Sequence, residues 1–359
     1  MKKVFLSFCM CVILLTSCAN QTETEQTPKL LKEMSLEEKV GQMLFVRYPE
    51  QVELQNLLAI NPGGVIMFGR DFKGLRRDEV KNKINAFQTK IPPVIGVDEE
   101  GGTVVRVSSN PELAPEKYAS PQEIYKSGGM AALIENTAEK SRLLTGLGIT
   151  MNLAPVADVS QDENDFMYSR SMGADAEETA ECIRNIVFVM KEKGILSCLK
   201  HFPGYGSSAD THDDAVTDFR DADSFRQITV RDGVKTGGDF IPFKAGIDAG
   251  ADSVLVSHNV VTALDSDNPA SLSPEIHRIL REELGFDGVI ITDDIAMGAV
   301  AEIDGVYIKA VNAGNDLIIT TDYMTAYNEI LNAVKQGIID KERINQSVGR
   351  ILRMKGLIK

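Results

Sequence analysis

The sequence predicts an α/β protein built as a single (β/α)8 barrel. Eight short runs rich in β-branched residues alternate with stretches of helical period, and nearly every residue of each run is apolar. Strands that alternate with helices form a parallel sheet, and continuously apolar strands are covered on both faces. The 359 residues would also fit two smaller domains, but nothing between Leu30 and Lys359 resembles an interdomain linker.

The predicted strands are closed by glycine, proline or aspartate, and most of the gaps between them contain a helical stretch, such as residues 176–193 and 275–284. The turns at residues 249–252 and 313–316 place a glycine at a helix C-cap directly before a strand. The eight strands are residues 44–47, 64–68, 94–97, 150–153, 196–200, 253–257, 288–292 and 316–320.

The first 29 residues are predicted to direct export rather than to fold. Residues 1–17 combine a charged start, an apolar run too short to span a membrane and a small-residue processing site. Cys18 stands where bacterial lipoprotein signals place the acylated cysteine, although an ordinary cleaved signal is the alternative. Residues 18–29 have the composition of a solvated tether. We therefore expect a domain of residues 30–359, anchored through Cys18 to a bacterial membrane on its periplasmic or extracellular face.

The composition excludes several classes of function. With 38 basic and 52 acidic side chains, the net charge of −14 offers no basic patch for nucleic acid. Outside the signal and Cys18, only Cys182 and Cys198 remain, so neither a disulfide framework nor a cysteine metal site is expected. The absence of tryptophan argues against a long platform for stacking polysaccharides, and leaves open a short pocket for one or two sugars.

In barrels of this kind the reactive groups lie at the C-terminal ends of the strands. Polar residues that follow the predicted strands are therefore the first candidates for a functional site. They are Asp98, Asp158, Lys200, His201, His258 and Asp293, and we expect all of them to face one mouth.

Asp293 follows the apolar run 288–292, so a rigid strand would deliver its carboxylate to the mouth, as suits a nucleophile. The alternative is that Asp293 caps a helix beginning at Ile295, because aspartate is a favoured N-cap. We expect Asp294 to point elsewhere, because successive side chains of a strand alternate in direction.

A glycine- and serine-rich loop, residues 200–213, carries two of the four histidines. Asp210 can orient His212, two residues further on, which makes His212 a candidate general acid/base. The alternative is a solvated loop without chemistry. His201, Asp210 and His212 could also bind a metal, but their spacing matches no compact motif and Lys200 would repel a cation. We therefore expect no metal and no cofactor.

Six motifs resemble those of glycoside hydrolase family 3, specifically its β-N-acetylhexosaminidase (β-N-acetylglucosaminidase) branch, from Leu36 to Leu357. Two of them are Val97-Asp98-Glu99-Glu100-Gly101-Gly102 and Lys200-His201-Phe202-Pro203-Gly204. The others lie at residues 35–43, 152–158, 169–171 and 285–294. The resemblance implies retaining cleavage of terminal β-linked N-acetylhexosamine, with Asp293 as nucleophile, His212 as acid/base and Asp210 as its orienting partner.

The resemblance also implies a subsite for the terminal N-acetylglucosamine of an oligosaccharide or peptidoglycan fragment. Arg106 could equally be a surface charge on a strand edge, and His258 matches a further histidine at the mouth. The residues that match the binding positions of the family are Asp98, Arg106, Arg170, Lys200, His201 and, less firmly, His258.

Two positions depart from the family pattern: Tyr205 stands where a second histidine is frequent, and Glu99 stands where glutamine is common. Neither removes a catalytic group. Two other functions stay open at this point. The first is a phosphorylase, because a histidine acid/base would not repel phosphate. The second is a lipoprotein that binds sugar without catalysis.

Overall fold

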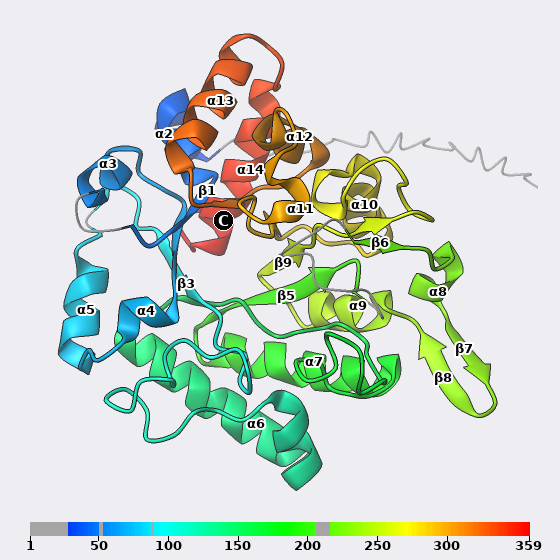
Figure 1. Ribbon diagram of the computed structural model, residues 1–359. Coiled ribbons are helices and arrows are strands. Elements are labelled where there is room, and N and C mark those ends of the chain that lie inside the picture. Colours follow the sequence, from blue (N-terminus) through cyan, green and yellow to red (C-terminus); the bar gives the residue numbers. More distant parts are fainter. Residues whose placement is uncertain (1–27, 50–52, 88, 206–215) are drawn as a thin grey trace, which may run out of the picture.

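The computed structural model describes residues 28–49, 53–87, 89–205 and 216–359 (Figure 1). The predicted signal, Cys18 and nearly all of the tether lie outside these residues, and the first helix begins at Lys29. Within the described ranges, no helix is both long enough and apolar enough to cross a membrane.

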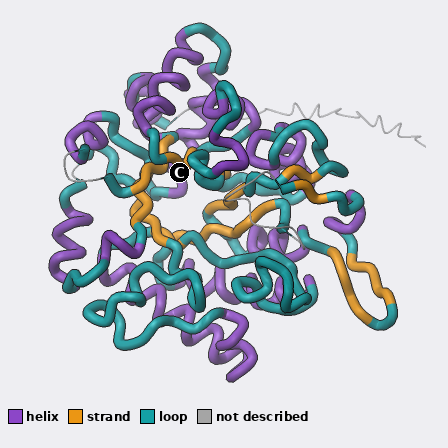
Figure 2. Tube along the Cα trace, viewed as in Figure 1, coloured by secondary structure: helices purple, strands orange, loops and turns teal. Residues whose placement is uncertain are grey.

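Eight parallel strands form one curved sheet at the centre of the molecule, surrounded by helices (Figure 2). Each of the eight predicted strands is present, in the order β11-β9-β5-β4-β3-β2-β1-β12 across the sheet. The strands are β1 (Leu44–Arg47), β2 (Gly64–Met67), β3 (Val94–Val97), β4 (Met151–Asn152), β5 (Leu196–Phe202), β9 (Ser253–Val256), β11 (Val289–Thr292) and β12 (Ile318–Thr320).

The sheet closes almost completely into a barrel. β12 pairs with β1 in parallel, with Leu44 opposite Ile318. Between β12 and β11 the pairing is shorter, one parallel bridge from Ile291 to Leu317. At this bridge the Leu317 N–H donates to the Ile290 carbonyl and the Thr292 N–H donates to the Leu317 carbonyl, both at 3.0 Å. The prediction of an eight-stranded parallel barrel is confirmed, with this seam nearly closed.

Helices cover the outside of the barrel and follow the strands as predicted. Helix α7 begins at an N-cap, Asp175, whose carboxylate accepts the N–H groups of Glu177 and Glu178. The long helices are α6 (Pro121–Leu147), α7 (Ala176–Glu192), α13 (Tyr323–Lys335) and α14 (Lys341–Met354). The intermediate ones are α2 (Leu36–Gln42), α5 (Arg77–Asn85), α9 (Phe240–Asp248) and α12 (Val306–Ala313). The short ones are α1 (Lys29–Glu33), α3 (Leu54–Ala59), α4 (Gly69–Phe72), α8 (Ala222–Arg226), α10 (Pro274–Arg278), which runs on into a π-turn (Ile279–Glu283), α11 (Gly298–Ala301) and a 3-10 turn (Ala270–Leu272).

The packing of Phe45 explains two glycines in neighbouring strands. Phe45 of β1 is fully buried, and its ring lies against Gly64 of β2 and Gly96 of β3. A Cβ atom added to Gly64 or Gly96 would come within 2.7 or 2.5 Å of that ring. Because interiors are packed without spare volume, glycine is required at both positions.

Two small sheets lie beyond the barrel and were not predicted. The hairpin of β7 (Ile228–Arg231) and β8 (Val234–Gly237) projects from the barrel (Figure 1). It turns at Asp232 and Gly233, which both have positive φ. The second sheet pairs β6 (Thr217–Asp218) with β10 (Val260–Val261), just after β9.

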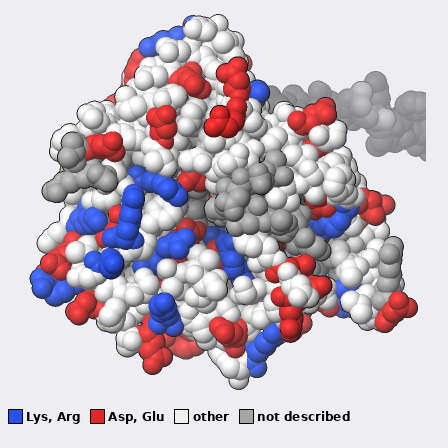
Figure 3. Space-filling view, viewed as in Figure 1, with Lys and Arg blue, Asp and Glu red and all other residues white. Residues whose placement is uncertain are grey.

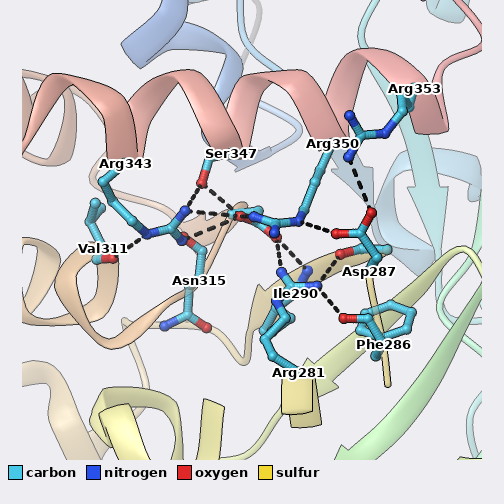
Figure 4. A network of polar contacts seen from close by, with 12 residues as sticks. Arg281, Phe286, Asp287, Ile290, Val311, Asn315, Arg343, Ser347, Arg350 and Arg353 are labelled. Atoms are coloured by element: carbon cyan, nitrogen blue, oxygen red, sulfur yellow. Dashed lines mark hydrogen bonds and ion pairs between the residues drawn. The ribbon is translucent and has the colours of Figure 1, made fainter. Parts of the chain in front are cut away.

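At the N-terminal end of the barrel, the fully buried carboxylate of Asp316 joins the C-terminal helix to the strands. Figure 4 labels its partners Arg281, Arg343, Ser347 and Arg350. Asp316 accepts hydrogen bonds from Arg281 Nη2 at 2.6 Å, Ser347 Oγ at 2.7 Å and the Ile290 N–H at 3.0 Å. Arg343 and Arg350 approach it within 3.3 and 3.6 Å. Burial alone would raise the pKa of Asp316, but the three guanidinium groups outweigh burial and hold that pKa below its ordinary value.

We therefore expect Asp316→Asn to lower the free energy of unfolding at pH 7 by ~3–5 kcal/mol, because it leaves buried guanidinium groups without their counterion. Asp287→Asn is the matched control: its carboxylate also meets Arg350 and Arg353, but it is 75% exposed. The control should cost ~1 kcal/mol or less. Urea denaturation of both variants measures the difference, and equal losses would contradict the assignment.

The pKa of Asp316 is lower in the folded protein than its ordinary value. Its contribution to the free energy of unfolding is therefore complete above the ordinary aspartate pKa and disappears as the pH falls through the lowered value.

Candidate active site

The opposite, C-terminal end of the barrel surrounds a cavity of about 240 Å³. On the face drawn in Figure 3, lysine and arginine side chains gather beside the hollow near the centre, although the whole chain is acidic. Six of the residues predicted from the sequence line the cavity, namely Asp98, Arg106, Arg170, Lys200, His201 and Asp293. Asp210 and His212 lie outside the described residues.

Lys200, near the end of β5, is the centre of a buried array of charges. Its Nζ donates to Asp98 Oδ1 at 2.7 Å and lies 2.6 Å from Glu100 Oε1. Arg170 donates to the same Glu100 carboxylate through Nε at 3.0 Å and Nη2 at 2.7 Å. Glu100 thus lies between two cations and does not line the cavity, whereas Asp98, Arg170 and Lys200 do.

Mutual attraction keeps these groups ionised. Burial would raise the pKa of Glu100, but Lys200 and Arg170 hold it far below its usual range. Burial would lower the pKa of Lys200, but Asp98 and Glu100 raise it above its ordinary value. Charged hydrogen-bonding groups fixed in this way can bind the hydroxyl groups of a ligand directionally.

His201 is held by Asp158, which lies beneath the cavity rather than in its lining. The fully buried Asp158 carboxylate faces His201 Nδ1 at 2.8 Å and accepts the N–H groups of His201 and Tyr205. Nδ1 therefore carries the imidazole proton, and Nε2 accepts from Arg170 Nη2 at 3.3 Å. The Tyr205 ring packs edge-on against His201, with 5.2 Å between the ring centroids.

Asp293 follows β11 directly and is fixed by its backbone and its carboxylate. Its N–H donates to the Val256 carbonyl of β9 at 2.9 Å, and its Oδ1 accepts the Asp294 N–H at 2.9 Å. No helix begins at Ile295, because the next helix, α11, starts at Gly298. The helix-cap interpretation of Asp293 is therefore wrong.

Asp294 also lines the cavity, contrary to the expectation that it points elsewhere. The strand ends at Thr292, so strand alternation no longer governs the next residues. Asp294 pairs with Arg47 at 3.0 Å, and its carbonyl accepts from His258 Nε2 at 3.1 Å. His258 is fully buried behind this backbone and does not line the cavity.

Sequence reasoning did not single out Arg47, Phe68, Glu100 or Tyr205 for this site. Arg47 ends β1, so the rule that polar residues at strand ends carry the chemistry would have found it. Glu100 lies inside the motif that supplies Asp98. Phe68 is apolar, so a search for polar residues could not find it. Its ring lies beneath the guanidinium groups of Arg47 and Arg106, with 4.4 and 5.7 Å from each guanidinium carbon to the ring centroid.

Comparison with known families decides the classification. Residues 35–354 match the family described as the glycosyl hydrolase family 3 N-terminal domain. The chain belongs to glycoside hydrolase family 3.

Three of the relatives in family 3 are named β-hexosaminidase or β-N-acetylglucosaminidase. The chain is 28% identical to "Beta-hexosaminidase LpqI" of Mycobacterium tuberculosis over 354 residues, which cover 95% of this chain and 86% of that protein. It is 32% identical to a "Beta-hexosaminidase" of Xanthomonas campestris pv. campestris over 265 residues, or 71% and 76% of the two chains. A family 3 β-N-acetylglucosaminidase structure from Paenibacillus superimposes with a TM-score of 0.80 at 28% identity, covering 90% of this chain but 62% of that longer one.

Glu99, one of the two departures from the family 3 pattern, supports residues 106–108, the segment that carries Arg106. Its buried carboxylate accepts three consecutive backbone N–H groups, from Arg106 at 2.7 Å, Val107 at 2.6 Å and Ser108 at 3.1 Å. Lys140 lies buried close by, and Glu99 and Glu100 partly offset the burial that lowers its pKa to about 8. Arg106 is thus held at the cavity, 3.8 Å from Asp98.

We expect Glu99→Gln to loosen this segment, because an amide has one acceptor oxygen where the carboxylate has two. Its NH2 group would face a backbone N–H, so the free energy of unfolding should fall by ~1–3 kcal/mol. Hydrogen exchange at the amides of Arg106, Val107 and Ser108 should become faster. Glu116→Gln, on the surface, is the control. If the two variants exchange alike at these amides, Glu99 does not hold the segment.

Proposed function

We propose that this chain is a retaining β-N-acetylhexosaminidase that removes terminal β-linked N-acetylglucosamine from oligosaccharides or peptidoglycan fragments. The observation that carries the proposal is that the Asp293 carboxylate lines the same small cavity as the fixed charges of Asp98, Arg170 and Lys200. Retaining glycosidases need a carboxylate nucleophile on one side of the anomeric carbon of a bound sugar. The names of the family 3 relatives agree with this activity.

In this proposal the charged array orients the terminal sugar and Asp293 reacts with it. Asp98, Arg106, Arg170, Lys200 and His201 bind the hydroxyl and acetamido groups. A carboxylate oxygen of Asp293 then forms a bond to the anomeric carbon while the bond to the departing oxygen breaks. Water next attacks the same carbon, releases Asp293 and leaves the anomeric configuration unchanged overall.

The proton donor in this proposal is His212, oriented by Asp210. Both residues lie in the segment 206–215, outside the described part of the chain. Tyr205, the described residue before this segment, lines the cavity, and β6 begins at Thr217, shortly after it. A histidine with a pKa near ~6.5 can give a proton to the leaving oxygen and later accept one from water without the burial that a carboxylic acid needs.

Turnover of aryl β-N-acetylglucosaminide against aryl β-glucoside, each with and without phosphate, tests the proposal. We expect hydrolysis of the first substrate without phosphate. Asp293→Asn should lower kcat by a factor on the order of 10⁴ while N-acetylglucosamine still binds. Asp304→Asn, an exposed aspartate outside this cavity, is the control. A phosphate requirement with a sugar 1-phosphate product would make the chain a phosphorylase, and full activity of Asp293→Asn would remove Asp293 from the chemistry.

We also propose that the chain is exported and anchored by a lipid on Cys18, as the composition of residues 1–17 supports. Cys18→Ser should move the protein from the membrane fraction to the soluble fraction, because the thioether that carries the lipid cannot form. Immunoblots of fractionated cells measure this. If Cys18→Ser stays with the membrane, the anchor lies elsewhere.

A further inference from the structure

We propose that Arg47 is a positioning residue for the nucleophile: it holds Asp294 so that the Asp294 N–H stays on the carboxylate of Asp293. The inference rests on the proposed function, because it takes Asp293 as the nucleophile. It assigns a role to an arginine that no motif of the sequence pointed to.

Arg47 is fixed from two sides at the mouth of the barrel. Its Nε lies 3.0 Å from Asp294 Oδ2, and its guanidinium lies 4.4 Å from the centroid of the Phe68 ring. Since Arg47 is the last residue of β1, its backbone is also part of the barrel wall. The contact with Asp294 is an ion pair without hydrogen-bond geometry, so charge attraction and the aromatic face together orient the guanidinium.

Asp294 in turn is held at both its carboxylate and its carbonyl. Oδ2 faces Arg47, Oδ1 accepts the Ala296 N–H at 3.0 Å, and the carbonyl accepts from His258 Nε2 at 3.1 Å. His258 Nδ1 lies 2.7 Å from Ser271 Oγ, so the buried imidazole can accept from that hydroxyl and donate to Asp294. These contacts hold the side chain of Asp294 and the peptide group that follows it, so they limit how far the Asp294 N–H can turn away from Asp293.

The N–H of Asp294 orients the carboxylate of Asp293. It donates to Asp293 Oδ1 at 2.9 Å. Displacement of a reacting atom by about 1 Å can cost ~10²-fold in rate, so a small rotation of this peptide would be felt in kcat.

Arg47 also balances the charge of two adjacent carboxylates. Burial raises the pKa of Asp294, and Arg47 opposes this effect. Without Arg47, the Asp294 carboxylate would take up a proton at a higher pH. The protonated group would no longer hold residues 294–296 in place. On acidification, activity would therefore be lost at a higher pH than in the unmodified protein. Among the described residues, the other ionisable groups that face these two carboxylates are Asp98, Arg106, Arg170, Lys200, His201 and Tyr205 from the cavity, Cys198 from β5, Tyr307 from α12 and His258 from behind.

A direct role in binding the sugar is the competing explanation, because the Arg47 side chain is 38% exposed and lines the cavity. The two roles give different measurements. A binding residue changes the inhibition constant of N-acetylglucosamine, whereas a positioning residue changes kcat and the acidic limb of the pH profile.

The experiment compares Arg47→Met, Arg47→Lys and Arg70→Met on aryl β-N-acetylglucosaminide. Arg70 is the matched control, an arginine on the same rim whose side chain is 64% exposed and points to the Tyr48 carbonyl. We expect Arg47→Met to lower kcat ~10- to 100-fold. We expect it to move the acidic limb upward by ~1 pH unit, with the inhibition constant of N-acetylglucosamine nearly unchanged. Arg47→Lys should restore the position of the acidic limb, because it restores the charge.

Hydrogen exchange gives a readout that does not depend on activity. The Asp294 amide should exchange faster in Arg47→Met than in Arg70→Met. The proposal is overturned if Arg47→Met and Arg70→Met have the same kcat and the same exchange rate at the Asp294 amide. It is also overturned if Arg47→Met weakens the binding of N-acetylglucosamine by the same factor by which it lowers kcat/KM, while the acidic limb of the pH profile does not move. If the unmodified protein does not hydrolyse aryl β-N-acetylglucosaminide, the proposed function is wrong. The comparison of hydrogen exchange would still decide the role of Arg47.

Discussion

The mouth of this barrel depends on one buried ammonium group, that of Lys200, between the carboxylates of Asp98 and Glu100. Each of these charges would cost several kcal/mol to remove from water alone, and only close pairing offsets that cost. At distances of 2.6 to 2.7 Å, Lys200 of β5 joins two carboxylates that follow β3, across the intervening strand β4. Without that pairing the cavity would lose both its charge pattern and its shape.

The two ends of the barrel use buried aspartates in different ways. At the N-terminal end, Asp316 is fully buried among arginines, and we assign it to stability. At the C-terminal end, Asp98 and Arg170 also have charged partners, but both side chains line the cavity. This division matches the general rule that barrel enzymes separate stability from chemistry along the barrel axis. Fixed charges at the mouth are already oriented when a ligand arrives, and the rigid strands beneath them keep that orientation.

The sequence predicted the eight strands because each is a continuous apolar run, and burial on both faces leaves little ambiguity. The hairpin of β7 and β8 was missed because it projects from the barrel and buries little, as the exposed Val230 and Val234 show, although Asp232-Gly233 is a recognised hairpin turn. Six site residues were found from strand ends and motifs. The direction of Asp294 and the burial of His258 could not be predicted, because both depend on how the chain turns after a strand ends.

Arg220 links the rigid barrel to the segment that carries His212. Its guanidinium binds Asp218 at 2.7 Å and Asp239 at 2.8 Å, and Nη2 lies 3.5 Å from the Gly204 carbonyl. Asp239 Oδ1 packs so closely on Gly204 that a Cβ there would lie 2.6 Å away, so this glycine leaves room for the ion pair. The described residues on either side of 206–215 are therefore tied to one arginine. In the proposed mechanism the nucleophile follows a rigid strand. The proposed proton donor, which acts first on the leaving oxygen and then on water, belongs to a segment whose flanking residues are fixed.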